Sequence, residues 1–527
     1  MLLNWMLWVP LGVGLACFAW PRRAVPWLAT AGSLVTLGLA VALVADFRPG
    51  APGLQHAVDH AWIPGLGVRY ELGVDGISLF LVLLTALLWA AASAFSALRP
   101  PERTRNYFFM LGLGETAALG AFLAQDLLLF VLFFDLMLVP FWFLIGAYGG
   151  ENRIAATTKM IVYTLVGSLL MLVAAIATGV LAQGSVGHLS FSLADLAAHP
   201  LSSGSQYWIF AFFAAAFLIK MPAFLVHGWM PDAYRAAPLP VLALLSGVLS
   251  KVGAYGFLRV VLPLYPQATV HFQEIVILIA LASILYGSVM AFTQANVRLI
   301  AGYSSVAQLG FITLGIFSLR ADGADGAVLQ MVNHGLVVAA IFLIIALLYE
   351  RAGTEDLARM GGIAMRAPVL AALFLIVTLA TLAMPGSANF IGELYILIGM
   401  FQAKIVYALV AAAGVVLAAY YALRLFQRSM HNRLPEGVRS REIGLLDGLV
   451  LAPLVACIAG LALYPGLVIG RSDASVRAPV AATCGPASPA AAGEAAPALE
   501  CPGGSGAVPA RAEAPAGSTP YASLPGS

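Results

Sequence analysis

Residues 207–225 have the sequence Tyr-Trp-Ile-Phe-Ala-Phe-Phe-Ala-Ala-Ala-Phe-Leu-Ile-Lys-Met-Pro-Ala-Phe-Leu, an apolar run that contains Lys220 and Pro222 near its end. The run is long enough to cross a bilayer as a helix, and Pro222 removes a backbone donor and opens that helix just after the lysine. A second apolar run, residues 240–262, holds Lys251 near its middle. A charged side chain at bilayer depth is costly and usually marks a path for ions or protons. These two stretches predict a membrane protein that handles protons.

The use of basic residues supports this interpretation. The chain contains four lysines and twenty-three arginines, and two of the lysines lie inside apolar runs. Arginine keeps its proton in proteins, whereas a lysine removed from water can release its own near neutral pH. Lysine is therefore concentrated where a proton carrier would be needed.

The composition fixes the broad class. Hydrophobic residues make up 61% of the 527 residues, charged residues 10%, and the mean hydropathy is +0.93. A soluble protein of this size would need a largely apolar surface, which excludes that class. Apolar windows of about 18 or more residues recur along the chain, so we expect an all-α polytopic protein in the lipid bilayer. The four cysteines show no metal-ligand spacing, and we expect neither a metal site nor a nucleic-acid partner.

Fourteen transmembrane helices are expected, with the thirteenth long or interrupted. They lie at residues 2–20, 24–45, 74–97, 107–124, 126–148, 158–182, 207–225, 240–262, 273–292, 298–318, 326–349, 368–384, 389–422 and 445–470. We divide the chain into helices 1–3 (residues 1–105), a repeat of helices 4–8 (106–262), a repeat of helices 9–13 (263–428) and helix 14 (429–474). Residues 475–527, rich in Ala, Pro, Gly and Ser, are expected to form a disordered tail.

The distribution of basic residues predicts the orientation. Seventeen of the twenty-seven Lys and Arg residues lie in one alternating set of connections, and four lie in the opposite set. Connections rich in Lys and Arg stay on the cytoplasmic side. Both termini are therefore expected outside.

Two of the expected helices contain breaks. One break follows Lys220 at Pro222, and the other, Met384-Pro-Gly-Ser-Ala-Asn-Phe-Ile-Gly-Glu393, precedes a glutamate. Broken helices at corresponding positions of two halves are the best sequence indication of a transport site. A repeat of five helices would make these two breaks equivalent.

Seven ionisable residues are candidates for proton transfer: Glu115, Asp135, Lys220, His227, Lys251, His334 and Glu393. Asp135 lies in an apolar run with no other charge within eight residues, so it is best accommodated beside a lysine. We expect an Asp135–Lys220 pair that acts as a switch, because separating the two charges would favour release of the lysine proton. Lys251, His334 and Glu393 are the residue types that a relay requires.

Other roles remain open for some of these residues. Glu115 could lie at a helix end facing solvent, and His227 could brace the helix break. Glu393 could lie in an aqueous mouth next to the Pro-Gly sequence. His334 is favoured as a relay group, because a buried histidine without a function is costly. Arg259 is expected to anchor a helix end at the membrane interface.

Several motifs together resemble a known family. They are Glu71-Leu-Gly-Val-Asp-Gly-Ile-Ser-Leu79, Phe134-Asp-Leu-Met-Leu-Val-Pro140, Lys220-Met-Pro-Ala-Phe-Leu-Val-His-Gly-Trp-Met-Pro-Asp-Ala233, Ser250-Lys-Val-Gly-Ala-Tyr-Gly-Phe-Leu-Arg259, Gly302-Tyr-Ser-Ser-Val-Ala-Gln-Leu-Gly310 and Pro385-Gly-Ser-Ala-Asn-Phe-Ile-Gly-Glu393. Over residues 1–470 the chain resembles the antiporter-like membrane subunits of respiratory complex I, the proton-pumping NADH:quinone oxidoreductase, and most closely those of the subunit M type. The resemblance implies two inverted five-helix repeats, each with a proton path.

The resemblance also implies roles for individual residues. Lys220 would exchange protons with the helix-5 acid, Lys251 would be the central lysine of helix 8, and His334 would bridge to Glu393, the exit group. Subunits L and N and the multisubunit sodium/proton antiporters usually carry lysine at the last position, so Glu393 favours the subunit M type. The helix-5 acid of the family is typically glutamate, whereas here it is Asp135, one methylene shorter.

On this interpretation the redox chemistry belongs to partner chains. We expect no cofactor on this chain, because it has no GxGxxG after a strand and no cysteine cluster. NADH, FMN, iron–sulfur clusters and quinone are expected on partner subunits, with L-like and N-like subunits as membrane-arm neighbours. The alternatives are a subunit of a multisubunit sodium/proton antiporter or of a membrane hydrogenase, and a membrane scaffold that does not pump.

Overall fold

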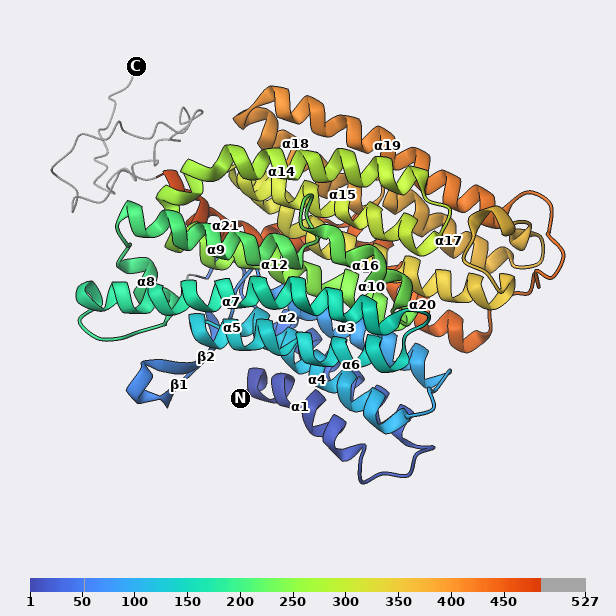
Figure 1. Cartoon of the computed structure of the whole chain (residues 1–527), viewed down its shortest axis with the longest axis horizontal. Coiled ribbons are helices and arrows are strands. Elements are labelled where there is room, and N and C mark those ends of the chain that lie inside the picture. The colour runs from blue at the N-terminus through green and yellow to red at the C-terminus, as the bar shows by residue number, and fades with distance from the viewer. Residues whose placement is uncertain (52, 485–527) are drawn as a thin grey trace, which may run out of the picture. The chain divides into compact units, whose positions relative to one another are not determined.

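The computed structural model describes residues 1–51 and 53–484, and these are helical apart from one β-hairpin. Most helices lie side by side with nearly parallel axes (Figure 1). The helices and strands are α1 (Leu2–Ala16), α2 (Val25–Asp46), β1 (Gln55–Ile63), η1 (Pro64–Leu66), β2 (Val68–Val74), α3 (Leu79–Ala97), α4 (Thr104–Leu123), α5 (Leu127–Leu136), α6 (Leu138–Tyr148), α7 (Arg153–Val186), α8 (Leu193–Ala198), α9 (Ser203–Lys220), η2 (His227–Trp229), α10 (Met230–Ala236), α11 (Leu239–Leu244), η3 (Leu245–Leu249), α12 (Ser250–Gly256), η4 (Phe257–Val261), α13 (Leu262–Leu264), α14 (Pro266–Thr293), α15 (Val297–Phe317), α16 (Ala321–Ala352), η5 (Leu357–Arg359), η6 (Ile363–Met365), α17 (Pro368–Thr381), α18 (Ala388–Ala403), α19 (Ile405–Met430), α20 (Leu445–Leu463) and α21 (Gly466–Cys484).

The polytopic helical class is confirmed. Ten helices among the described residues are long and apolar enough to cross a membrane, counting α5 with α6 and α11 through α13 as single spans. The other expected spans correspond to α1, α4, α9 and the pair α17 and α18, which are shorter or more polar. The count of fourteen spans and their inverted repeats stay predictions.

The expected helix 8, residues 240–262, corresponds to Leu239–Leu264, a continuous but irregular helix that we call helix 8. Two five-residue π-helical segments, η3 and η4, flank the seven-residue helix α12, which carries Lys251. Its whole apolar window is buried inside the protein, as are those of α15 and α16. These three helices therefore form the centre of the bundle, where a charged side chain is farthest from lipid.

Both expected breaks are present, but the second lies within one span. Helix α9 ends at Lys220, and the chain continues through a loop into η2 and α10. Neither α17 nor α18 alone reaches the ~20 residues that a bilayer requires. Ala388 O accepts a hydrogen bond from Asn333 Nδ2 at 2.7 Å, and the backbone at Gly399 contacts Gly323, so α18 runs antiparallel along α16.

The expected helix 389–422 is therefore corrected. It comprises α18 and part of α19, which separate at Lys404. The residues between α17 and α18 form the break of one discontinuous span, and positive φ angles at Ala383 and Gly386 interrupt the helix there.

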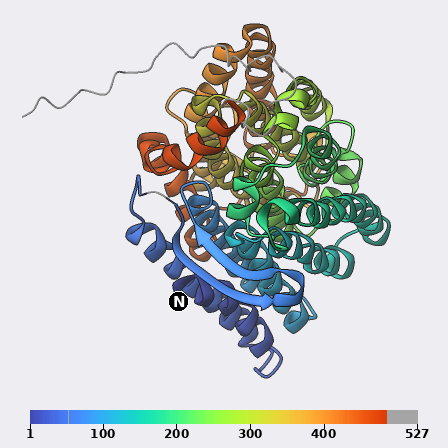
Figure 2. The same ribbon diagram turned by 90° about the vertical axis from the view of Figure 1, so that its left-hand side faces the viewer.

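The hairpin β1–β2 was not expected from the sequence. Its strands pair antiparallel with Val58 opposite Leu72 and Ala61 opposite Arg69, and an Arg69–Asp59 ion pair with a 2.7 Å N–O distance links them. Four polar residues, Gln55, His56, Asp59 and His60, interrupt the apolar residues of β1, which explains why no apolar window covers it. Figure 2 shows the hairpin crossing the ends of the N-terminal helices. We call the side of the protein that carries it the hairpin face.

The C-terminal boundary also differs from the prediction. Helix α20 ends at Leu463, before Pro465, and a separate helix, α21, extends to Cys484. The first ten residues of the expected tail, 475–484, thus belong to a helix. The remainder of that tail, residues 485–527, lies outside the described residues.

Candidate proton-transfer site

Lys220 is buried at the C-terminus of α9. Its Nζ donates a hydrogen bond to the carbonyl oxygen of Phe134 at 3.3 Å and lies 4.6 Å from the centroid of the Phe134 ring. Phe134 is the residue before Asp135 on α5, so the fold brings the lysine and the acid next to each other. Pro222 ends α9 at this point, which leaves the ammonium at the helix break.

Asp135 interacts electrostatically with Lys220 and contacts the Ser168 hydroxyl, while its Oδ1 has no hydrogen-bond partner. Within the described ranges, no direct ion pair joins Asp135 to Lys220 at 4.0 Å or less. The short aspartate side chain accounts for the gap. The structure therefore holds Asp135 and Lys220 near each other without a direct ion pair between them.

Lys251 lies at the centre of the bundle with no exposed surface. Its Nζ donates hydrogen bonds to the carbonyl oxygen of Ser246 at 2.6 Å and to Ser250 Oγ at 3.4 Å. The π-helical segment η3 makes the first contact possible, because its backbone carbonyls depart from the α-helical pattern. No carboxylate forms an ion pair with Lys251 in the part of the chain that the structure describes.

His334 lies on α16, 3% exposed, and interacts electrostatically with Lys251. Neither Nδ1 nor Nε2 has a hydrogen-bond partner among the described residues. A buried ring nitrogen without a partner is costly, which is unusual for a purely structural histidine. Both nitrogens are available to exchange protons with neighbouring groups.

Glu393 ends a chain of hydrogen bonds that the sequence analysis missed. Its Oε1 accepts from Gln308 Nε2 at 2.8 Å, and Gln308 Oε1 accepts from Gln330 Nε2 at 2.7 Å. Gln330 lies on α16 one turn before His334, so the two amides extend from the histidine towards the glutamate. All four side chains are buried. The signal available in the sequence was a glutamine in each of two strongly apolar helices, which is rare at bilayer depth.

Glu115 is not at a helix end facing solvent, as one alternative held. It is 1% exposed in the middle of α4, and its Oε2 accepts a hydrogen bond from Ser33 Oγ of α2 at 2.8 Å. Its Oε1 has no partner, and the residues around it belong to α1, α2, α3 and α4. The fold thus places Glu115 in the N-terminal helices, apart from the other candidates.

His227 lies in η2, in the loop region after the Lys220 break. Its Nε2 is 3.3 Å from the hydroxyl oxygen of Tyr286, and its ring packs against Phe224, Tyr286 and Tyr303. Its Nδ1 has no hydrogen-bond partner among the described residues. This aromatic setting suits bracing of the break, and it leaves one nitrogen available for a proton.

The candidates therefore form two main groups. Asp135 and Lys220 meet where α5 and α9 pack, and Lys251, His334 and Glu393 follow one another through the centre of the bundle with Gln330 and Gln308 between the last two. The arrangement can hold charges apart and move protons between buried groups. Burial of ionisable side chains at this depth is costly, which favours a functional role for them.

Known proteins share this fold over most of the chain. The family described as "NADH:quinone oxidoreductase/Mrp antiporter, TM" matches residues 124–419. NADH-quinone oxidoreductase subunit M of Rhodobacter capsulatus is 38% identical over 463 residues, which cover 86% of this chain and 90% of that protein.

Solved structures agree with the sequence relatives. A chain of respiratory complex I from Thermus thermophilus superposes with a TM-score of 0.82 at 31% identity, covering 90% of this chain and 99% of that one. A chain of the Mrp complex from Dietzia sp. DQ12-45-1b gives a TM-score of 0.80 at 22% identity over 92% and 99% of the two chains, which indicates a common fold. The chain belongs to the NADH:quinone oxidoreductase/Mrp antiporter transmembrane family and, within it, is a homologue of NADH-quinone oxidoreductase subunit M.

Proposed function

We propose that this chain is a proton-translocating membrane-arm subunit of a complex I-type NADH:quinone oxidoreductase. The observation that carries the proposal is the buried series Lys251, His334, Gln330, Gln308 and Glu393, in which ionisable and amide side chains follow one another across four helices. The names of its relatives support the same enzyme complex. In this proposal the complex lies in a bacterial inner membrane, with L-like and N-like subunits beside this chain.

The two groups would have different tasks. Asp135 and Lys220 form the switch: when the lysine moves towards the acid its charge is stabilised, and when it moves away its proton is released to the interior. Lys251 receives that proton at the centre of the bundle. His334 and the amides of Gln330 and Gln308 then carry it to Glu393, the exit group. Glu115 and His227 would serve as additional proton-transfer groups outside this main line.

Electron transfer would take place on partner chains. NADH, FMN, iron–sulfur clusters and quinone are assigned to those subunits, and this chain would respond to their chemistry through a change in charge or conformation at the switch. No step proposed for this chain requires a cofactor. Its own residues hold, release and accept protons.

A subunit of a multisubunit sodium/proton antiporter is the second candidate, and the similarity to the Mrp complex chain favours it. The two candidates differ in their partners and in their ion. Glu393 favours the first, since the antiporter chains usually carry lysine there. Transport that depends on sodium would favour the second.

The first experiment is purification of the tagged chain in mild detergent, identification of co-purifying subunits by mass spectrometry, and measurement of NADH:quinone activity. Recovery with flavin- and iron–sulfur-bearing subunits supports the first candidate. Recovery with small antiporter-type membrane chains and no NADH oxidation supports the second.

Proton pumping by the assembled complex then tests the residues. Lys220→Ala and Lys251→Ala are expected to abolish the contribution of this subunit to pumping. Lys159→Ala is the matched control, because Lys159 forms an exposed ion pair with Asp232 with a 2.8 Å N–O distance. Loss of Lys220 or Lys251 with assembly and pumping intact would support the non-pumping scaffold instead.

A further inference from the structure

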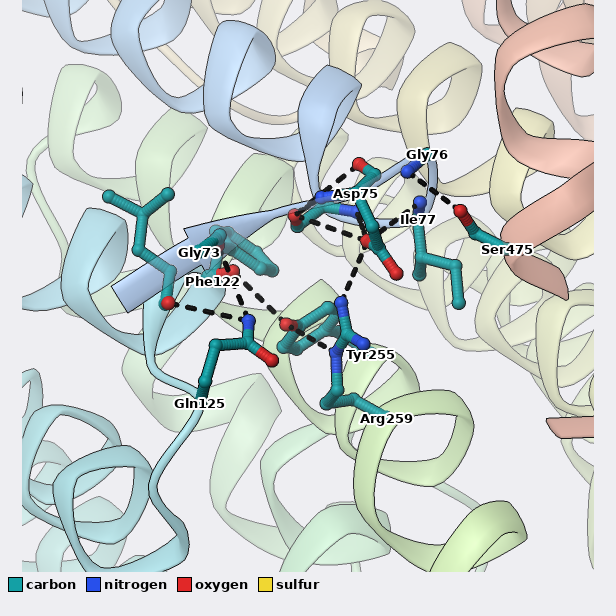
Figure 3. A network of polar contacts seen from close by, with 11 residues as sticks. Gly73, Asp75, Gly76, Ile77, Phe122, Gln125, Tyr255, Arg259 and Ser475 are labelled. Atoms are coloured by element: carbon teal, nitrogen blue, oxygen red, sulfur yellow. Dashed lines mark hydrogen bonds and ion pairs between the residues drawn. The ribbon is translucent and has the colours of Figure 1, made fainter. Parts of the chain in front are cut away.

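A line of polar side chains on helix 8, from Lys251 to Arg259, runs towards the hairpin face; the Lys251 ammonium itself bonds to Ser246 and Ser250 and not to Tyr255. Lys251, Tyr255 and Arg259 recur at every fourth residue, so they lie on one side of the helix. Arg259 Nε donates a hydrogen bond to the Tyr255 hydroxyl oxygen at 3.1 Å, and that hydroxyl donates to the carbonyl oxygen of Phe122 at 3.0 Å (Figure 3). This line starts at the same lysine as the proposed relay but follows helix 8 rather than α16.

An ion pair closes the line at its outer end. Arg259 Nη2 and Asp75 Oδ1 are 2.7 Å apart, and the two side chains are only 14% and 9% exposed. Asp75 Oδ1 also accepts hydrogen bonds from the backbone N–H groups of Ile77 and Ser78, each at 3.1 Å (Figure 3). The carboxylate is thereby fixed at the start of α3, and it holds the guanidinium in turn. Arg259 was expected to anchor a helix end at the membrane interface; it lies near the end of helix 8, with its guanidinium bound by Asp75.

Helix α21 covers this ion pair. The backbone N–H of Gly76 donates a hydrogen bond to Ser475 Oγ at 3.0 Å (Figure 3), and Ser472 Oγ donates to Asp325 Oδ1 at 3.0 Å. A Cβ atom at Gly76 would lie 1.9 Å from the carbonyl oxygen of Arg471, so only glycine lets α21 approach this turn. The helix therefore packs directly against the segment that fixes Asp75.

Arginine suits the role of a barrier. Its guanidinium keeps its proton at any physiological pH, so it cannot pass one on, and a fixed positive charge raises the barrier to protons in a narrow path. A lysine or histidine at position 259 would instead extend the line of carriers. The Asp75 carboxylate and α21 keep the guanidinium in place.

We propose that the Asp75–Arg259 pair, covered by α21, is an electrostatic seal that prevents protons on Lys251 from reaching the hairpin face along helix 8. The seal directs them to His334 and Glu393. It rests on the proposed function, because it presupposes that Lys251 carries a proton. Arg259 and Asp75 are positioning residues in this proposal, since neither carries the proton.

The test measures proton leak in membrane vesicles that contain the assembled complex. Arg259→Gln is expected to retain NADH:quinone activity measured with an uncoupler, while the proton gradient decays about tenfold faster than in the wild type after NADH is exhausted. Asp75→Asn removes the charge that holds the Arg259 guanidinium, and its vesicles are expected to leak protons less than those of Arg259→Gln. This variant replaces Arg259→Gln in the test if the Arg259→Gln complex does not assemble. Arg69→Gln is the matched control, because it breaks an exposed Arg–Asp pair on the same face.

Vesicles of an assembled Arg259→Gln complex as tight as wild type would overturn the seal. A purely structural pair would lower the amount of complex without changing leak per complex, and that result also overturns it. Addition of Lys251→Ala to Arg259→Gln is expected to stop the leak; an unchanged leak refutes a path through Lys251. Failure of the proposed function appears separately, as unaltered pumping in Lys251→Ala alone.

Discussion

Gln308→Leu should interrupt the relay with little change in the volume of the side chain. Gln308 is 2% exposed and joins two partners: its amide donates to Glu393 Oε1 at 2.8 Å, and its carbonyl oxygen accepts from Gln330 Nε2 at 2.7 Å. Leucine can make neither bond. Both oxygens of Glu393 would then lack a partner, because Oε2 has none already.

The size of the effect follows from the bond that is lost. A hydrogen bond to a charged group contributes about 1.5–3 kcal/mol, and a barrier higher by that amount slows a step by about 10- to 150-fold. The transfer of protons to Glu393 is therefore expected to slow by about one to two orders of magnitude. Electron transfer measured with a soluble acceptor should not change, since it does not pass through this chain in the proposed function.

The assay compares proton pumping with NADH oxidation in proteoliposomes that contain the purified complex. Gln206→Leu is the control, because Gln206 is equally buried and bonded, to the carbonyl oxygen of Leu201 at 2.8 Å and to the backbone N–H of Gln267 at 3.1 Å, but lies outside the relay. Both variants should lose some stability. The reasoning is refuted if Gln308→Leu pumps as many protons per electron as Gln206→Leu.

Three further outcomes can be checked in the same preparations. Asp135→Glu should preserve pumping, since the longer side chain can reach Lys220 directly, whereas Asp135→Ala should abolish the contribution of this subunit; equal pumping by both variants would contradict the switch. Glu115→Gln keeps an acceptor for the Ser33 hydroxyl, so the complex should assemble but pump less, and unchanged pumping would exclude Glu115 as a proton carrier. Burial raises the pKa of Glu71, on the hairpin outside the membrane spans, above its ordinary value of 4.5. A carboxyl group whose pKa is raised in the folded state lowers stability once the pH exceeds its pKa in the unfolded state. Glu71→Gln should therefore raise the Tm at neutral pH but not at a pH below the unfolded-state pKa. An equal rise in Tm at neutral and at low pH would show another cause.

The membrane class, the two helix breaks and the location of the lysines could be predicted from the sequence, because each is a local contrast within an apolar background. Lys220 and Lys251 stand out among apolar neighbours, and Pro222 marks the break beside the first of them. The Pro-Gly break was located correctly but assigned to the junction of two spans, since apolar content alone does not distinguish a break from a turn.

Features that depend on partners far apart in the sequence could not be predicted. The Arg259–Asp75 pair joins helix 8 to the turn between β2 and α3, so burial of Arg259 became visible only in the fold. Gln308 and Gln330 were overlooked because neutral amides carry no charge contrast, although together they form a hydrogen-bonded chain that ends at Glu393. The separation of Asp135 from Lys220 depends on one methylene and on the exact packing of α5 against α9.

The two π-helical segments on either side of α12 have a mechanical consequence. Each π turn holds one residue more than an α turn, and successive residues of a helix are about 100° apart around the axis. If η3 and η4 each shifted by one residue in the same direction, the seven residues between them would turn by about this angle while the ends of the span stayed fixed. Lys251 is the one charged residue among these seven. A paired shift of η3 and η4 would therefore turn the Lys251 ammonium from one neighbour to another while the surrounding helices stay in place.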